Sequence, residues 1–258
     1  MSAIATSPLT LFMAAWLGAC LGSFSNVLIY RLPRNLQVAR GRSRCPSCEA
    51  TVAWYDNVPI LSWLLLRGKC RICRAPIAVR YPLVELGGAL CAVAGILRFG
   101  WTVEGLSASI FLILLLDIAV IDWEHMIIPH TLTVGGGLIG LVLALFASPG
   151  LLMALVGATL GAGVILGVNV LYKAVRGVVG MGGGDVMLMG MVGVYLGPWG
   201  VWGTLFGGAF LGTFYAVLAG RGRVSGAAKL PFGTFLAAAA AVVLFAGEVI
   251  ARWYLAQF

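Results

Sequence analysis

The sequence has little charge, and this shortage excludes an ordinary soluble domain. Only 10% of its 258 residues are charged and 61% are hydrophobic, whereas a typical globular domain is about 25% charged. So few charges cannot cover the surface of a soluble protein of this length, and no polar segments are present to enclose one large buried core. Hydrophobic stretches of roughly 18 residues or more recur along the chain, which indicates bilayer-spanning helices.

Basic residues are missing from the start of the chain. No Lys or Arg precedes Arg31, and this excludes a secretory signal, which needs a basic region before its apolar core. The apolar stretch from Pro8 to Tyr30 is also too long for such a core. We therefore expect a retained first membrane span with the N-terminus outside.

The hydrophobic stretches predict an all-α polytopic membrane protein with about eight spans. Residues 1–29 contain the first span, residues 30–82 form a small cytoplasmic insert, and residues 83–258 form a seven-helix membrane domain. Two boundaries rest only on Gly and Pro, at Ala147–Gly150 and Leu196–Trp199, and Pro can also kink a membrane helix without ending it. The predicted spans are 8–29, 83–98, 105–121, 127–147, 150–173, 185–198, 200–219 and 231–252.

Basic residues gather on one side of this predicted topology, which holds 15 of the 17. Loops rich in Lys and Arg stay in the cytoplasm, so this side is predicted to be cytoplasmic. Anionic lipid headgroups explain the net charge of +8 better than nucleic acid does, because no nucleic-acid recognition motif is present. The 15 residues are Arg31, Arg34, Arg40, Arg42, Arg44, Arg67, Lys69, Arg71, Arg74, Arg80, Lys173, Arg176, Arg221, Arg223 and Lys229.

The insert contains two C-x-x-C motifs separated by 21 residues: Cys45-Pro-Ser-Cys48 and Cys70-Arg-Ile-Cys73. Two residues between sulfurs let one tight turn aim both at a metal ion, and a second pair completes a tetrahedron. The alternative is two disulfides, which the reducing cytoplasm disfavours. We predict a structural Zn²⁺ site, because four sulfurs leave no open coordination position.

The basic residues beside these cysteines are expected to lower the thiol pKa values. They are Arg44, Lys69, Arg71 and Arg74. The remaining two cysteines, Cys20 and Cys91, lie inside apolar spans and are expected to be packing residues.

Only nine residues are acidic, and two of them stand out by position. Asp122 ends the third predicted span, and Asp185 opens the sixth after a glycine-rich run. Both are expected near the cytoplasmic membrane surface, where an ionisable residue is functional by default. Two neighbouring carboxyl groups can share one proton, which provides a base to activate water and an acid to polarise a carbonyl. Gly182, Gly183 and Gly184 would let an extended substrate backbone approach.

Simpler readings of these carboxylates stay open at this point. Asp185 stands where a helix N-cap belongs, and Asp122 or Glu124 could cap the next span. Asp117 lies about 140° around the helix from Asp122 and is expected to point elsewhere. A zinc-stapled membrane scaffold or a transporter, with the aspartates as caps or ion ligands, is the non-enzyme alternative.

Several motifs, in this order, resemble the bacterial type IV prepilin peptidases, which are leader peptidases and N-methyltransferases of the GxGD aspartic type. The resemblance covers residues 20–190, and the ordered combination is more specific than any one motif. The motifs are Gly22-Ser-Phe-Ser-Asn26, Arg31-Leu-Pro33, Ser43-Arg-Cys45-Pro-Ser-Cys48, Trp54-Tyr-Asp-Asn57-Val-Pro59-Ile-Leu-Ser-Trp63, Arg67-Gly-Lys-Cys70-Arg-Ile-Cys73, Arg80-Tyr-Pro-Leu-Val-Glu85-Leu86, Ile121-Asp122-Trp-Glu-His125-Met-Ile-Ile-Pro129 and Gly182-Gly-Gly184-Asp185.

The resemblance implies that Asp122 and Asp185 are the catalytic pair of an enzyme in the bacterial inner membrane. Its substrates would be prepilins or pseudopilins, which serve type IV pili or type II secretion. Their basic leaders would be cleaved at the cytoplasmic face, and the new N-terminus would be methylated with S-adenosylmethionine. The insert would be the methyltransferase part, and no residues that bind S-adenosylmethionine are identified.

Two positions depart from the family pattern. His130 stands where the family often has Asp after the Pro of the first aspartate motif, and we expect it to be a polar residue at a helix start. Met187 stands where Lys often follows the second aspartate. Neither change removes the carboxylate pair. A third function class keeps the peptidase and lacks the methyltransferase.

Overall fold

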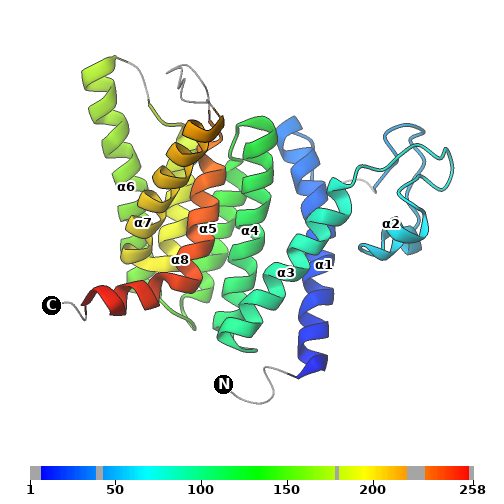
Figure 1. The fold of residues 1–258 in the computed structure, drawn as a ribbon, viewed down its shortest axis with the longest axis horizontal. Coiled ribbons are helices and arrows are strands. Elements are labelled where there is room, and N and C mark those ends of the chain that lie inside the picture. Colours follow the sequence, from blue (N-terminus) through cyan, green and yellow to red (C-terminus); the bar gives the residue numbers. More distant parts are fainter. Residues whose placement is uncertain (1–6, 39–42, 178–179, 220–229, 256–258) are drawn as a thin grey trace. The chain divides into compact units, whose positions relative to one another are not determined.

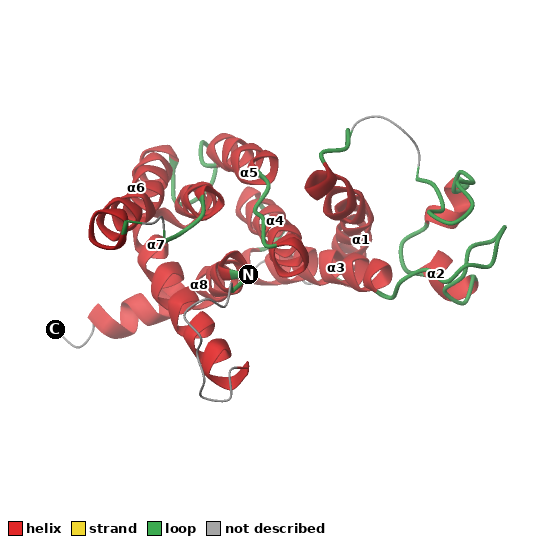
Figure 2. Ribbon diagram, turned by 90° about the horizontal axis from the view of Figure 1, so that it is seen from above, coloured by secondary structure: helices red, strands yellow, loops and turns green. Residues whose placement is uncertain are grey.

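The computed structural model describes residues 7–38, 43–177, 180–219 and 230–255, with side chains as far as residue 247. Within these ranges the chain is helical and contains no strand, as Figure 2 shows. The predicted all-α membrane fold is therefore confirmed. Five of the residues that set the predicted orientation lie outside the described ranges: Arg40, Arg42, Arg221, Arg223 and Lys229.

Eight α-helices and two short 3₁₀ helices make up the described fold. Five of the helices (α1, α3, α4, α6 and α7) are long and apolar enough to cross a membrane, and α5 and α8 add shorter apolar segments, so the protein is a multi-pass membrane protein. The helices are α1 (Pro8–Arg31), η1 (Leu32–Arg34), η2 (Trp54–Asn57), α2 (Leu61–Leu65), α3 (Arg80–Phe99), α4 (Val103–His125), α5 (His130–Leu143), α6 (Leu151–Arg176), α7 (Gly183–Ala219) and α8 (Phe232–Leu255).

The chain divides into two compact units, residues 1–117 and 118–258, and α4 contributes to both. In the first unit α1 and α3 lie side by side, with the loops around α2 outside this pair (Figure 1). Glycines let the two helix backbones touch: a Cβ on Gly18 would collide with the carbonyl oxygen of Gly88. Near the end of α1, the Asn26 amide donates a hydrogen bond of 3.0 Å to the carbonyl oxygen of Tyr81.

In the second unit α6 and the first part of α7 run antiparallel at close range. A Cβ on Gly157 would meet the carbonyl oxygen of Gly193, and one on Gly161 would meet that of Met189. In this antiparallel register, each contact four residues later in α6 falls four residues earlier in α7. This register continues toward the start of α7, where Asp185 lies.

The chain reverses direction at Gly197-Pro198, which interrupts α7 with backbone angles of φ 66° and ψ −174° at Gly197. A Cβ on Gly161 would lie 3.3 Å from Val201 Cγ2 as well as against Met189. Residues 189 and 201 would be about 18 Å apart in a straight helix, so both can reach Gly161 only if the chain turns back. The division predicted at Leu196–Trp199 thus separates two arms of α7. The other uncertain division, at Ala147–Gly150, is the connection between α5 and α6.

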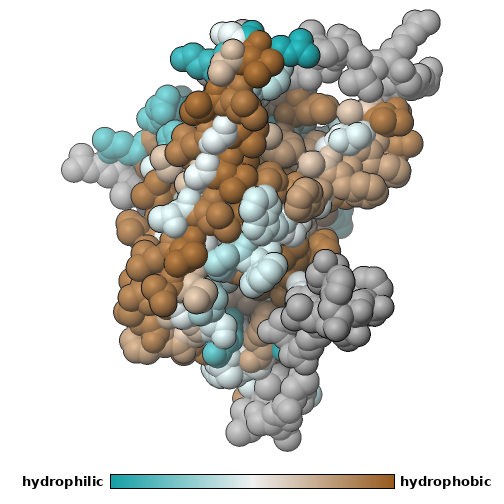
Figure 3. Space-filling view, turned by 90° about the vertical axis from the view of Figure 1, so that its left-hand side faces the viewer, coloured by the Kyte–Doolittle hydropathy of each residue, from teal (hydrophilic) through white to brown (hydrophobic). Residues whose placement is uncertain are grey.

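The outside of the helices carries large apolar side chains. Figure 3 shows a face that is predominantly hydrophobic, interrupted by small patches of polar residues. On α6 and α7, for example, Val170 is 70% exposed and Phe210 is 70% exposed. Such surfaces are stable in contact with lipid acyl chains, which agrees with the predicted lipid surroundings.

The close approach of α6 and α7 predicts different effects for two glycines of the same helix. Gly157→Val forces the side chain into the backbone of Gly193, and we expect a loss of about 1–3 kcal/mol in the free energy of unfolding. Gly163→Val is the matched control, because nothing lies within 4 Å of a Cβ at Gly163. Thermal unfolding of both variants in detergent measures the difference, and equal stability would contradict the packing described.

Candidate active site and metal centre

The four cysteines of the insert converge on one point. Their sulfur atoms all lie within 4.8 Å of one another, and Cys45 Sγ lies 3.7 Å from Cys73 Sγ. Zn–S bonds of about 2.3 Å in a tetrahedron place sulfurs about 3.8 Å apart, whereas a disulfide needs about 2.05 Å. All four cysteines are free thiols. Their arrangement fits a metal ion such as zinc, and the disulfide alternative is not what the structure contains.

The two C-x-x-C motifs have the same local fold. The N–H of Cys45 donates to the carbonyl oxygen of Ala50 at 2.9 Å, and that of Cys70 donates to Ala75 at 2.8 Å. In each motif the residue after the second cysteine has a left-handed backbone: φ is 55° at Glu49 and 60° at Arg74. Each turn thus presents two sulfurs on one side, and the two turns face each other across the metal position.

Backbone hydrogen bonds, burial and the neighbouring sulfurs shift the pKa values of the Cys45 and Cys48 thiols. Hydrogen bonds from the backbone of Ser47 and then of Cys48 lower the pKa of Cys45 to about 6. The backbone of Ala50 lowers the pKa of Cys48, but burial and the neighbouring sulfurs outweigh it and raise the value to about 11. None of the causes of these two shifts is a basic side chain, although basic neighbours were expected to lower the thiol pKa values. A bound dication would favour the thiolate form of all four.

Arg71, one of the basic neighbours, instead pairs with Asp56. Its Nε lies 2.7 Å from Asp56 Oδ2, and its Nη2 lies 2.5 Å from Oδ1. This two-point contact lowers the pKa of Asp56 and ties the second cysteine turn to η2. A further bond of 2.6 Å, from the N–H of Ile60 to Glu85 Oε2, ties the insert to α3. None of these contacts was predicted from the sequence.

The sulfur geometry predicts that the metal is lost together with the ligands. The Cys45→Ser/Cys70→Ser variant removes one sulfur from each turn, and we expect its zinc content to fall from about one ion per chain to near zero. Because ligand thiols must lose their protons, the remaining affinity should also decrease as the pH falls. Elemental analysis of the purified protein measures this.

The Cys20→Ser variant is the matched control, since Cys20 lies on α1 outside the cluster. It should keep its zinc. Full zinc occupancy in the double variant would eliminate the four-sulfur site.

The Asp122 carboxylate is buried near the C-terminal end of α4, with the residue 4% exposed. Its Oδ2 accepts a hydrogen bond of 2.8 Å from the N–H of Thr234, and the Thr234 hydroxyl lies 3.3 Å away. Thr234 is the third residue of α8, and its N–H also donates to the carbonyl oxygen of Pro231 at 3.2 Å. The N-terminus of a helix also favours negative charge, and α8 thus holds this carboxylate in place.

Asp185 is the third residue of α7 and is 9% exposed. Its Oδ2 accepts a hydrogen bond of 3.0 Å from the N–H of Gly182, the residue that precedes the helix. Asp185 thus caps the start of α7 from the third helical position. The simpler reading had placed Asp185 at the N-cap itself, which the structure does not show. The caps proposed for Asp122 and Glu124 are not formed either, because Pro129 precedes α5 and no side chain caps it.

The two carboxylates lie in the same unit and within electrostatic reach, since the charge of Asp122 acts on Asp185. Ile128, in the connection between α4 and α5, packs against the starts of α7 and α8, which contact the two carboxylates. A Cβ on Gly184 would lie 2.7 Å from Ile128 Cβ, and one on Gly233 would lie 2.6 Å from Ile128 Cδ1 and 3.0 Å from Asp122 Oδ2. The starts of α7 and α8 therefore meet beside the end of α4.

The glycine run is less extended than expected. Gly183 and Gly184 are the first residues of α7, so only Gly182 precedes the helix. The Ile128 side chain fills the space beside Gly184, whereas nothing lies within 4 Å of a Cβ on Gly183. Open space beside the run thus exists at Gly183, and at Gly182 the nearest group is the Asp185 carboxylate.

Asp117 and His130 have the places expected for them, and no place was predicted for the third residue, Met187. Asp117 is fully buried in the first unit, where it contacts Ser25 of α1 and not the carboxylate pair. His130 is exposed and begins α5, as predicted for a polar residue at a helix start. Met187 is 44% exposed.

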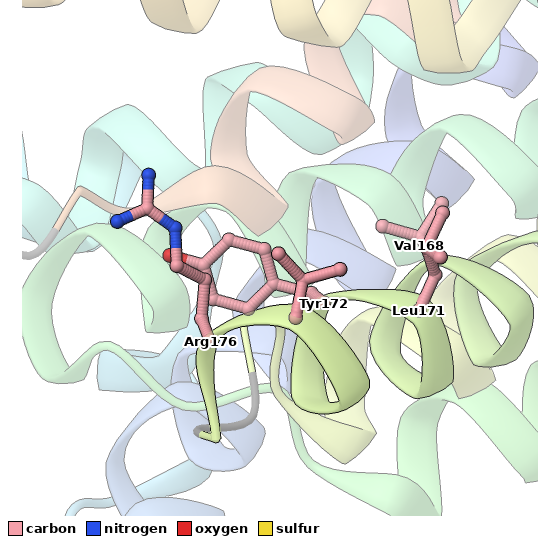
Figure 4. A pocket seen from close by; sticks show the side chains of 5 residues that line it. Val168, Leu171, Tyr172 and Arg176 are labelled. Atoms are coloured by element: carbon pink, nitrogen blue, oxygen red, sulfur yellow. The ribbon is translucent and has the colours of Figure 1, made fainter.

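A shallow groove of about 240 Å³ lies on the C-terminal half of α6. All of its lining residues belong to α6 (Figure 4), so it is a surface of one helix and not an enclosed site. Its walls are Val168, Leu171, Tyr172, Val175 and Arg176.

Sequence reasoning missed Thr234 and Gly233, which contact Asp122 from more than 100 residues away. It also missed Asn169, which hydrogen-bonds the segment before Asp185. Only Asn169 gave a signal, as a polar residue within an apolar helix. The supporting role of Thr234 depends on helix packing and has no local sequence sign.

Comparison with known proteins decides the family. Residues 16–99 match the family model of the bacterial peptidase A24 N-terminal domain, and residues 109–217 match that of the type IV leader peptidase family. The chain belongs to the type IV leader peptidase family. No solved structure matches it.

Curated relatives of this leader peptidase family carry the name prepilin leader peptidase/N-methyltransferase. The protein of Stutzerimonas stutzeri is 34% identical over 98% of this chain and 96% of its own length, and that of Aeromonas hydrophila is 36% identical over 92% and 91%. The protein of Myxococcus xanthus is 41% identical over 80% of this chain, but the match spans only 63% of that relative.

Proposed function

We propose that this protein is a membrane aspartic endopeptidase that removes the basic leader peptide of type IV prepilins or pseudopilins at the cytoplasmic membrane face. We further propose that it N-methylates the new N-terminus. The observation that carries the first proposal is the pair of buried carboxylates, Asp122 and Asp185, held within electrostatic reach at one end of the second unit. The family of the chain supports the same chemistry.

The proposed reaction uses the pair as acid and base. One carboxylate takes a proton from water, which attacks the scissile carbonyl carbon, while the protonated partner donates its proton to the carbonyl oxygen. The tetrahedral intermediate then breaks its C–N bond, and the leaving amine takes up a proton from the dyad. No covalent intermediate is needed. Gly182, Gly183 and Gly184 are proposed to flank the substrate backbone, with the open side of Gly183 giving it room.

The proposed membrane face follows from which helix ends meet at the site. Asp122 lies near the end of α4 and Asp185 at the start of α7, and Lys173 and Arg176 lie in the last turn of α6, antiparallel to α7. Basic residues at that end favour the cytoplasm. We therefore propose the bacterial inner membrane with the N-terminus outside, so that a basic leader would reach the dyad from the cytoplasm.

The insert, residues 30–82, is proposed to be the methyltransferase part, with residues 1–29 as the first span and residues 83–258 as the membrane domain that carries the dyad. Cys45, Cys48, Cys70 and Cys73 would hold a structural Zn²⁺ that stabilises an insert with little hydrophobic core. S-adenosylmethionine would supply the methyl group. We assign no residues to its binding, because the described chain has no strand to begin a nucleotide-binding βα turn.

The transporter alternative finds little support in the second unit. Within its described part, Asp122, Thr133, Asp185 and Thr204 are the buried polar or charged residues. A path for ions or solutes needs a polar lining through the membrane, and four such residues do not provide one. The peptidase is therefore the better-supported function.

The dyad predicts that each carboxylate is indispensable. Asp122→Asn and Asp185→Asn should each abolish leader removal in membranes, because the amide can neither accept the proton from water nor share one. Gel-shift analysis of a prepilin substrate measures the cleavage. Asp117→Asn is the matched control on α4 and should cleave normally, since Asp117 lies in the first unit. Normal cleavage by either dyad variant would remove that residue from the mechanism.

The second activity predicts a mass change on the product. After cleavage in the presence of S-adenosylmethionine, the pilin N-terminus should be about 14 Da heavier than after cleavage without it. Intact-mass analysis of the processed pilin measures this. An unmodified N-terminus under both conditions, with cleavage intact, would leave a peptidase without methyltransferase activity.

A further inference from the structure

Asn169 makes two hydrogen bonds to a single residue of the connection between α6 and α7. Its Oδ1 accepts from the N–H of Met181 at 2.8 Å, and its Nδ2 donates to the carbonyl oxygen of Met181 at 3.1 Å. Both backbone groups of Met181 are satisfied by this one amide side chain. An amide side chain carries both a donor and an acceptor, so Asn169 alone can fix the position of both peptide groups of Met181.

Asn169 also continues the packed face of α6. Gly157 contacts Gly193 and Gly161 contacts Met189, and the same antiparallel register pairs residue 169 with residue 181. Ile165, between them on this face, is fully buried. The same face of α6 thus contacts α7 as far as its start, and Asn169 extends this contact to Met181, two residues before α7 begins.

Met181 is directly followed by the residue that hydrogen-bonds Asp185. The N–H of Gly182 donates to Asp185 Oδ2 at 3.0 Å, and the N–H of Asp185 donates back to the carbonyl oxygen of Gly182 at 3.2 Å. Holding Met181 therefore fixes where Gly182 points its N–H. A second contact supports the same segment: a Cβ on Gly180 would lie 3.0 Å from the ring of Tyr172, one turn after Asn169.

We propose that Asn169 is a positioning residue for the peptidase, which sets the Asp185 carboxylate through Met181 and Gly182. The inference rests on the proposed function, because it assigns Asp185 to the reaction. Asn169 touches no reacting atom. Its amide sets the geometry of a glycine-rich segment that has few other side-chain contacts, since Gly182 and Gly183 meet almost nothing but Asp185.

The test uses the full-length enzyme in proteoliposomes with a prepilin substrate. Asn169→Leu removes both hydrogen bonds at similar volume, and Asn169→Asp keeps only the acceptor for the Met181 N–H. We expect kcat per folded enzyme to fall roughly 10- to 100-fold in Asn169→Leu and less in Asn169→Asp, with KM little changed, because small misplacements of a reacting group have costs of this size. Hydrogen exchange at the Met181 and Gly182 amides should accelerate in the same order.

Thr159→Val is the matched control on α6, because the Thr159 hydroxyl bonds only to carbonyl oxygens of its own helix. It should keep the wild-type kcat. A merely structural role for Asn169 would lower the folded fraction and leave kcat per folded enzyme unchanged, and that result overturns the proposal. If Asn169→Leu does not fold, Asn169→Asp decides by the same two readouts.

The Asp185→Asn variant separates a positioning role of Asn169 from the proposed peptidase reaction. Wild-type kcat in the Asn169 variants together with an inactive Asp185→Asn variant refutes the positioning role alone. Normal cleavage by Asp185→Asn refutes both.

Discussion

Lipid offers no hydrogen-bond partner to a peptide group, and this constraint governs the structure. In the described chain the apolar segments pair their backbone groups within helices, and apart from the break at Gly197 the irregular backbone lies in the connections and the insert. N–H groups at helix starts donate to the two carboxylates that we propose to be catalytic. The N–H of Thr234 at the start of α8 binds Asp122, and the N–H of Gly182 just before α7 binds Asp185. Helix starts thus provide the hydrogen-bond donors that two buried carboxylates need.

Small residues supply the precision of this arrangement. Glycines on α6 bring its backbone against α7, and the resulting register carries through to Asn169 and Met181. Gly184 and Gly233 leave room for Ile128, which packs the connection after α4 against the starts of both α7 and α8. Because apolar attraction between helices is weak within lipid, close backbone packing of this kind holds membrane helices together.

Much of this organisation could be predicted from the sequence. Hydropathy gave the all-helical membrane class, spacing gave the four cysteines that the structure brings together, and ordered motifs gave the family. The division at Leu196–Trp199 was uncertain because proline can kink or end a helix, and only contacts to Gly161 show that the chain reverses there. The helical start of α7 at Gly183 was not predicted, since glycine runs favour extended or irregular chain. The contact of Thr234 with Asp122 joins residues 112 positions apart, and no local pattern encodes it.

The central claim is that the carboxylates at positions 122 and 185 share one site. Cross-linking tests it in native membranes with Asp122→Cys and Asp185→Cys combined, Cys20 and Cys91 replaced by serine, and the zinc cysteines left in place. A control pair combines Asp185→Cys with Leu196→Cys, about 16 Å farther along the part of α7 that precedes the break at Gly197. We expect a disulfide under mild oxidation for the first pair and none for the second. A folded protein in which positions 122 and 185 fail to cross-link would contradict it.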